Sequence, residues 1–148
     1  MQYKERGFTL VELIIVMAIM AILAAIAAPN YQSFMAQRRL NGAARQFMSD
    51  LMHARMQAVT QNNNFKVSFR NYHEYQLLDD DNNNGAADTG EALVIKNIQT
   101  DYHDVTFSRI ASPVFEPRGT AINTSATVTN PAGSKTISVN IAGRVKID

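Results

Sequence analysis

The sequence predicts an α+β protein in which a long N-terminal helix packs on an antiparallel β-sheet head. The evidence is an apolar block over residues 8–28, a helical spacing of apolar residues beyond Pro29, and short alternating segments with turn signals after residue 62. No second long helix interrupts those segments, which argues against a parallel crossover sheet. We therefore expect one helix and one sheet in a single head domain.

The amino-acid composition excludes several classes of function for this chain. The chain has 148 residues, and residues 1–7 hold two of its 14 basic and one of its 13 acidic residues, which leaves 12 of each in the remainder. This balance gives no broad electrostatic footprint for nucleic acid or anionic lipid. The absence of cysteine excludes disulfides and thiolate metal sites. No nucleophile and base set, phosphate loop or catalytic acid pair stands out, so we predict no enzymatic activity.

The apolar block, residues 8–28, has the length that a helix needs to cross a bilayer, about 20 residues. Only Thr9 and Glu12 are polar within it. A cleaved secretory signal ending near Ala27 is the alternative, and it would release a soluble protein. The length of the block and the cost of an ionisable group in hydrocarbon favour a membrane helix with a special use for Glu12.

Glu12 has two explanations. With Thr9 it forms the spacing of a capping box, in which each side chain satisfies a free backbone amide at the start of a helix. Alternatively, a cut after Gly7 would expose the amino group of Phe8, and Glu12 of a neighbouring chain could pair with that cation. The residues alone leave both explanations open.

Residues 29–62 are expected to continue the helix as an amphipathic segment, with Pro29 bending it at the membrane exit. Its apolar stripe is Leu40, Ala44, Phe47, Leu51, Ala54 and Ala58. A second line, Met48, Met52 and Met56, is interpreted as core filler, with a surface for packing another subunit as the alternative.

Residues 63–148 are predicted to form the β-rich head. The expected strands begin with Phe65–Phe69 and Tyr75–Leu77 and continue with Leu93–Lys96, Val105–Ile110, Val114–Phe115, Ala126–Thr129, Lys135–Asn140 and Arg144–Ile147.

An acidic loop offers oxygen ligands at calcium-loop spacing. The candidate ligands are Asp80, Asn82, Asn84, Asp88 and Glu91, with Gly85 at the sixth position. A polar hairpin tip without an ion is the alternative, because Asp, Asn and Gly also supply turn geometry. Asp79 and Asp81 are expected to face solvent in either case.

Arg144 and Lys146 lie two residues apart, so on a strand both project from one face. Such a pair could contact DNA phosphates, or it could simply be a solvated strand.

The N-terminal residues closely resemble the type III signal of type IV pilins and type II secretion pseudopilins. The similarity rests on a basic leader, Gly7, the run from Phe8 to Glu12, a long apolar run and Pro29, all in register. It implies that a prepilin peptidase removes residues 1–7 and methylates Phe8, and that Glu12 pairs with a neighbour's N-terminus during filament assembly. It also implies a bacterial inner-membrane protein that crosses once and holds its head in the periplasm.

The later sequence resembles the minor pseudopilins of the GspH and FimT/FimU group. The similarity involves the helix from Ala44 to Gln61, the phrase Phe115–Gly119 and the terminal phrase Ile141–Ile147. It implies a pilin-like fold and a subunit at or near a filament tip that helps initiate or cap a secretion pseudopilus or a type IV pilus, with other pilins as partners. Because some such relatives bind DNA through a basic motif after a glycine, Arg144 and Lys146 leave a DNA-uptake role as the alternative. A secreted calcium-binding protein is the third hypothesis.

Overall fold

The computed structural model describes residues 7–109 and 111–148, so residues 1–6 of the leader and Ile110 of a predicted strand lie outside it. The chain divides into an N-terminal unit up to Met35 and a head unit, Ala36–Asp148. Helix α1, Leu10–Gln61, contributes to both units. It runs through Pro29 without a break, so Pro29 does not interrupt the helix, and the bend there stays a prediction.

Helix α1 ends where the asparagine run begins. Asn62 has a left-handed φ of 55°, and the amide of Asn63 donates to the carbonyl of Ala58 over 3.1 Å. This is the Schellman arrangement, in which a residue with positive φ satisfies the last free carbonyls of a helix. The short asparagine side chain tolerates that conformation better than a β-branched residue would.

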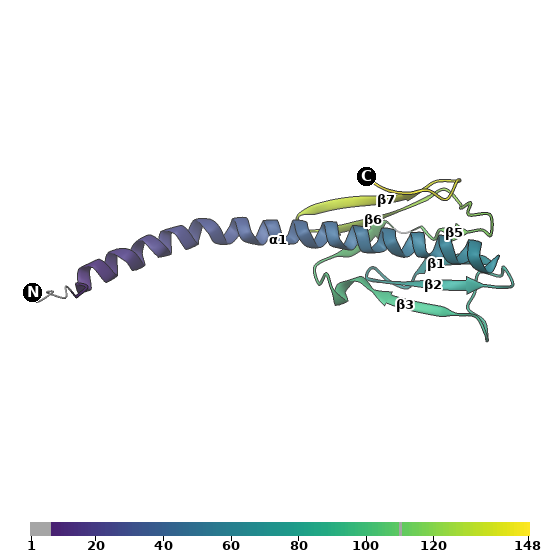
Figure 1. Cartoon of the computed structure of the whole chain (residues 1–148), viewed down its shortest axis with the longest axis horizontal. Coiled ribbons are helices and arrows are strands. Elements are labelled where there is room, and N and C mark those ends of the chain that lie inside the picture. Colours follow the sequence, from purple (N-terminus) through teal and green to yellow (C-terminus); the bar gives the residue numbers. More distant parts are fainter. Residues whose placement is uncertain (1–6, 110) are drawn as a thin grey trace, which may run out of the picture. The chain divides into compact units, whose positions relative to one another are not determined.

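The strands of the head unit form two antiparallel sheets rather than one (Figure 1). The first has the order β3-β2-β1-β5, from β1 (Asn64–Phe69), β2 (Glu74–Asp80), β3 (Leu93–Asn97) and β5 (Val114–Phe115). The second has the order β4-β6-β7-β8, from β4 (Thr106–Arg109), β6 (Thr124–Asn130), β7 (Gly133–Val139) and β8 (Val145–Ile147). A 3₁₀ turn, η1 (Ile98–Thr100), follows β3 on the way to the second sheet. The strands and their antiparallel pairing agree with the sequence, whereas the division into two sheets does not.

The head core forms where both sheets meet the apolar stripe of α1. All six residues of the predicted stripe are buried, and its three alanines, Ala44, Ala54 and Ala58, are fully inaccessible, as is the neighbouring Ala43. The Phe47 ring packs edge-on against Tyr75 of the first sheet at 5.0 Å and Phe107 of the second at 5.1 Å, centroid to centroid. Small residues let strands approach the helix closely, and one aromatic ring from α1 reaches both sheets.

The second line of methionines is not core. Met48 is partly buried against the core, but Met52 and Met56 are exposed on the surface of α1. The core-filler interpretation is therefore wrong for these two residues. The buried stripe is already filled by alanines and by Phe47, and the helix turns the two methionines away from it.

A polar cluster ties the first turns of the head's helix to the second sheet. Arg39 donates two hydrogen bonds to Asp104, each 2.8 Å long, and the buried Asn130 amide donates to the carbonyl of Ala36 over 2.8 Å. The Arg39 bonds lower the pKa of the Asp104 carboxyl. The bidentate pair fixes the orientation of the loop that holds Asp104.

We predict that this ion pair makes the stability of the head depend on pH. Because the folded pKa of Asp104 is lowered, the stabilisation is complete above the unfolded pKa, about 3.9, and is lost as the pH falls below it. Asp104→Asn should lower the Tm at pH 7, and the difference from wild type should shrink steadily as the pH falls below about 4. Thermal unfolding followed by circular dichroism in detergent tests this, with Asp101→Asn, an exposed acid nearby, as the control. A difference that is unchanged at low pH would contradict the role of the pair.

Candidate functional site

The N-terminal segment presents its residues openly. Among the described residues, no atom beyond its chain neighbours lies within 4 Å of the position that a Cβ on Gly7 would take, and Phe8 is 84% exposed. The apolar side chains of residues 8–28 are likewise exposed in the isolated chain. Helix α1 contains a segment long and apolar enough to cross a membrane, with a mean hydropathy of 2.9 and none of it buried. Cleavage between Gly7 and Phe8 stays a prediction.

Glu12 and Thr9 form the capping box that the sequence predicts. The amide of Glu12 donates to the Thr9 hydroxyl over 3.2 Å, and the amide and hydroxyl of Thr9 both donate to Glu12 Oε2 over 2.9 Å. Helix α1 then begins at Leu10. The exchange satisfies amides that a helix start leaves free.

Capping leaves half of the Glu12 carboxylate available. Both bonds from Thr9 end on Oε2, and no residue in the described part of the chain donates to Oε1 or forms an ion pair with Glu12. The carboxylate therefore has an acceptor oxygen free for a cation from outside the chain. The two explanations of Glu12 are compatible, and its pairing with a neighbour stays a prediction.

In the head, Arg55 joins the two distal phrases that resemble the pseudopilin group. Its Nε donates to the carbonyl of Gly119 over 2.9 Å, and its second guanidinium nitrogen donates to the carbonyl of Ala142 over 3.2 Å. Gly143 has a φ of +70°, and a Cβ there would lie 2.0 Å from the Gly119 carbonyl oxygen. The two turns therefore touch through backbone, and only glycine fits. Sequence reasoning missed this junction, although the helix from Ala44 to Gln61 and both distal segments carry the resemblance to the pseudopilin group.

The basic pair lies beside this junction. Arg144 and Lys146 are exposed on either side of the buried Val145, as strand alternation predicts. Lys146 forms an ion pair with Asp148, whereas the structure gives the Arg144 guanidinium no partner among the described residues. One free guanidinium is a small footprint for DNA, so DNA binding stays a prediction.

The side chains of the acidic loop form separate local hydrogen bonds. Asn82 and Asn84 donate to Asp88 Oδ2 over 2.7 and 2.5 Å, and the amide of Asp88 donates to Glu91 over 2.9 Å. Asp80 is buried and accepts from the amide of Gly85 over 2.9 Å. Within the described ranges, no three acidic or histidine side chains come together to hold a metal.

A cation of the chain itself enters the loop. The Lys66 ammonium donates to the Gly85 carbonyl over 2.8 Å, and the amide of the same glycine donates to Asp80. The five candidate ligands do not form one coordination shell in this arrangement, so the structure supplies no geometry for calcium, which stays a prediction from spacing.

The expectation that Asp79 faces solvent is wrong. Asp79 is 8% exposed, and the side-chain amide of Asn63 donates to both Asp79 and Asp81. Burial raises the pKa of Asp79, and the nearby charges of Asp81 and Glu91 raise it further, against the lowering by Asn63. The alternation along β2 turns Asp79 toward the end of α1, which the loop composition did not reveal.

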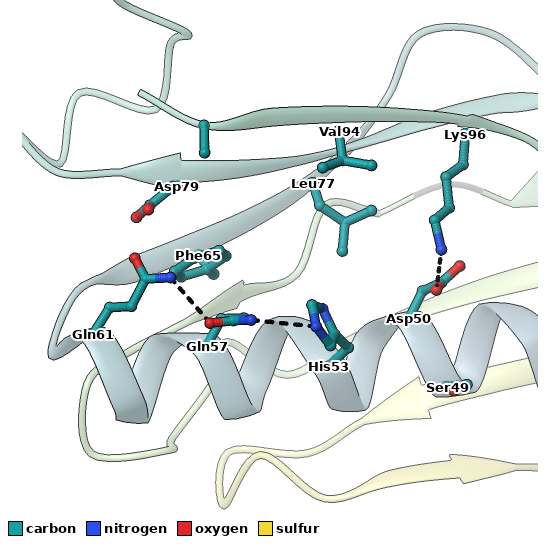
Figure 2. A pocket seen from close by; sticks show the side chains of 11 residues that line it. Ser49, Asp50, His53, Gln57, Gln61, Phe65, Leu77, Asp79, Val94 and Lys96 are labelled. Carbon is teal, nitrogen blue, oxygen red and sulfur yellow. Dashed lines mark hydrogen bonds and ion pairs between the residues drawn. The ribbon is translucent and has the colours of Figure 1, made fainter. Parts of the chain in front are cut away.

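A pocket of about 350 Å³ opens between α1 and the edge strand β3 (Figure 2). Its helix wall is polar: Gln61, Gln57 and His53 are linked in a row. Its sheet wall includes the apolar side chains of Phe65, Leu77 and Val94. The 4-residue spacing of the polar wall is the sequence signal that could have found it.

One end of the pocket is closed by a buried acid. Asp50 accepts from the Tyr75 hydroxyl and from Lys96 Nζ, the latter over 2.5 Å. Burial and the bond to Asp50 raise the pKa of Tyr75, so its hydroxyl remains a donor. The Lys96 ammonium and the Tyr75 hydroxyl thus satisfy the Asp50 carboxylate.

The comparisons with known proteins agree with these features. Residues 43–143 match the family described as type II transport protein GspH, and residues 2–28 match the prokaryotic N-terminal methylation motif. The fimbrial protein EcpB of Eikenella corrodens is 49% identical over 39 residues, which is 26% of this chain and 24% of that protein. The chain thus aligns with only about a quarter of this curated relative.

Two solved structures share the fold. The type IV minor pilin FimU of Pseudomonas aeruginosa is 17% identical, with a TM-score of 0.57 over 78% of this chain and 92% of that one. The minor pseudopilin EpsH of the Vibrio cholerae type 2 secretion system is 10% identical, with a TM-score of 0.58 over 74% of this chain and 96% of that one.

The long helix with two antiparallel sheets and the capped, apolar N-terminal segment define a pilin-like structural subunit. The chain belongs to the GspH family of type II transport proteins.

We predict that the glycine at the Arg55 junction is sterically required. Gly143→Ala should lower the free energy of unfolding by at least about 2 kcal/mol more than Gly119→Ala. Gly119 has a similar φ of +77°, but the nearest atom to its Cβ position is a Val59 methyl at 3.3 Å. Urea unfolding followed by tyrosine fluorescence compares the two, and equal losses would show that the junction tolerates a methyl group.

Proposed function

We propose that the chain is a minor pilin or pseudopilin that helps initiate or cap a type II secretion pseudopilus or a type IV pilus. It is made as a single-pass inner-membrane precursor with its head in the periplasm, and it takes a place at the filament tip after assembly. A prepilin peptidase cuts between Gly7 and Phe8 and methylates Phe8. Other pilin-like subunits are its partners in the filament.

The observation that carries this proposal is the unpaired Glu12 oxygen at the start of an exposed apolar helix. An ionisable group in hydrocarbon is costly unless it is paired. In the membrane the capping bonds from Thr9 satisfy one oxygen. In a bundle of helices, the new amino terminus of a neighbouring subunit would satisfy the other. The carboxylate then favours transfer of the helix from lipid into the filament.

The exposed bond before the helix and the apolar surface of the helix also support the proposal. The Gly7–Phe8 bond precedes the helix and is exposed, as a peptidase needs. The apolar surface of residues 8–28 is unpartnered in the single chain, so a bilayer or other helices must cover it. A subunit joined head-to-tail through such a helix gives an open helical assembly rather than a closed ring.

We expect Glu12→Gln to separate capping from pairing. The amide oxygen of glutamine can still accept bonds from Thr9, but it carries no charge for a neighbour's amino group. Membrane insertion should be unchanged, while incorporation into sheared filaments should fall about tenfold, measured by quantitative immunoblotting. Thr9→Val, which removes the capping hydroxyl and keeps the charge, is the matched control and should retain most incorporation. Normal incorporation of Glu12→Gln would rule out the pairing role.

The proposed cut is tested by the mass and N-terminal sequence of the mature chain. The wild type should begin at Phe8 with one added methyl group, and Gly7→Val should remain at precursor mass. Gly90→Ala, at an exposed glycine whose Cβ position has no described atom within 4 Å, serves as the control for a glycine substitution outside the motif. A mature chain that begins beyond Ala27 would support the secreted, soluble alternative instead.

A further inference from the structure

The outer edge of the first sheet is apolar and uncovered. Leu93, Val94 and Ile95 of β3 are 40%, 51% and 47% exposed, and β2 is the only strand that pairs with β3 in the described part of the chain. From the register with β2, the backbone amides and carbonyls of Leu93 and Ile95 point away from the sheet. Three consecutive apolar residues are typical of a strand covered on both faces, and an open edge of this kind invites a partner.

This edge carries negative charge at one end. Asp81, Asp88 and Glu91 lie in the loop that leads into β3, and none of them forms an ion pair with a base in the described chain. We call β3 and these three acids the β3 flank. A partner for it should be apolar and basic.

The opposite side of the head has the complementary character. A groove of about 540 Å³ is lined by Met52, Met56 and Val59 of α1 together with Arg144 and Val145. The two methionines and Val59 are 45–57% exposed. Methionine side chains adapt to partners of varied shape, which suits a docking surface. We call these five residues the Met flank.

The Met flank is positively charged. The Arg144 guanidinium has no partner among the described side chains, and Arg55 beside it bonds only to carbonyl oxygens. The Arg55 junction holds the turn that carries Arg144 against α1. The guanidinium is therefore presented from a fixed backbone.

The two flanks lie on opposite sides of the head's helix. Figure 1 shows β3 on one side of α1 and β7 with the C-terminal end of the chain on the other. A copy placed alongside in the same orientation would bring the β3 flank of one head against the Met flank of the next. Antiparallel pairing of β3 with β3 of a copy would instead reverse one head, which chains inserted the same way in one membrane disfavour.

We propose that the β3 flank binds the Met flank of a second copy of this chain, in a heterologous side-by-side contact of heads in the same orientation. Apolar side chains meet at the centre, and the acids of one copy face Arg144 of the other. Such a contact is not closed by symmetry, so it permits a row of subunits. The inference rests on the proposed function, which anchors all copies in one membrane.

The absence of native cysteine allows a direct test in the full, membrane-anchored chain. Val94→Cys and Met56→Cys chains with different tags are produced together, without other pilins, and treated with a short bis-maleimide. We expect a cross-linked dimer when the two are mixed and none when either is present alone. A dimer from Val94→Cys alone would show β3 pairing with itself and would overturn the proposal. A mixture that yields no more than the single variants would also overturn it.

Charge exchange tests the register of the contact. Arg144→Glu in the Met56→Cys chain should lower the cross-linked yield about tenfold, and Glu91→Arg in the Val94→Cys chain should restore it. Arg118→Glu, an exposed arginine outside both flanks, is the control. A yield unaffected by Arg144→Glu would overturn the proposed orientation. Circular dichroism checks that each variant is folded.

The failure of this inference is distinguishable from the failure of the proposed function. Chains that mature at Phe8 and enter filaments but give no mixed cross-link would contradict the contact alone. Chains that mature elsewhere or never enter filaments would contradict the proposed function whatever the cross-linking shows.

Discussion

The two parts of helix α1 suit different environments, one apolar and one aqueous, and the rest of the structure depends on that constraint. The first part of α1 exposes apolar side chains on all sides, and contact of these side chains with water is unfavourable. The second part exposes polar groups around one buried stripe. The stripe consists largely of alanines with a single phenylalanine, Phe47, so strands approach the helix closely on two sides. Phe47 of that stripe joins the aromatic rings of both sheets in one core, in which Phe107 of the second sheet also packs directly against Phe69 and Tyr75 of the first.

In the head, short sequence segments that lie far apart in the chain are in contact. Arg55 bonds the backbone of two turns, and Gly143 lets those turns meet at a distance that a side chain would forbid. The junction sets the position of Arg144, and so links a purely structural contact to the charge of the Met flank. A guanidinium suits this work because its donors form a rigid fork that can serve two carbonyls at once.

Two of the surfaces that a partner could cover carry acids without an ion pair among the described residues. Glu12 has a free oxygen in an apolar setting, and the acids near β3 have no base beside them in the described structure. By contrast, the acids that pack against the helix are compensated within the chain: Asp104 by Arg39, and Asp50 by Lys96 and Tyr75. Internal pairs stabilise the head, whereas unpaired groups at the surface favour association, since burying them alone would be costly.

The sequence by itself determined the extent of the helix, the buried stripe, the capping box, and the positions and antiparallel pairing of the strands, because each depends on local spacing. Tertiary structure alone decided the division into two sheets, the exposure of Met52 and Met56, the burial of Asp79 and the approach of Lys66 to the acidic loop. Each of these depends on which distant residues meet across the helix. The spacing of residues in the sequence predicts the face of a helix or strand on which a side chain lies, but not which distant residues contact that side chain.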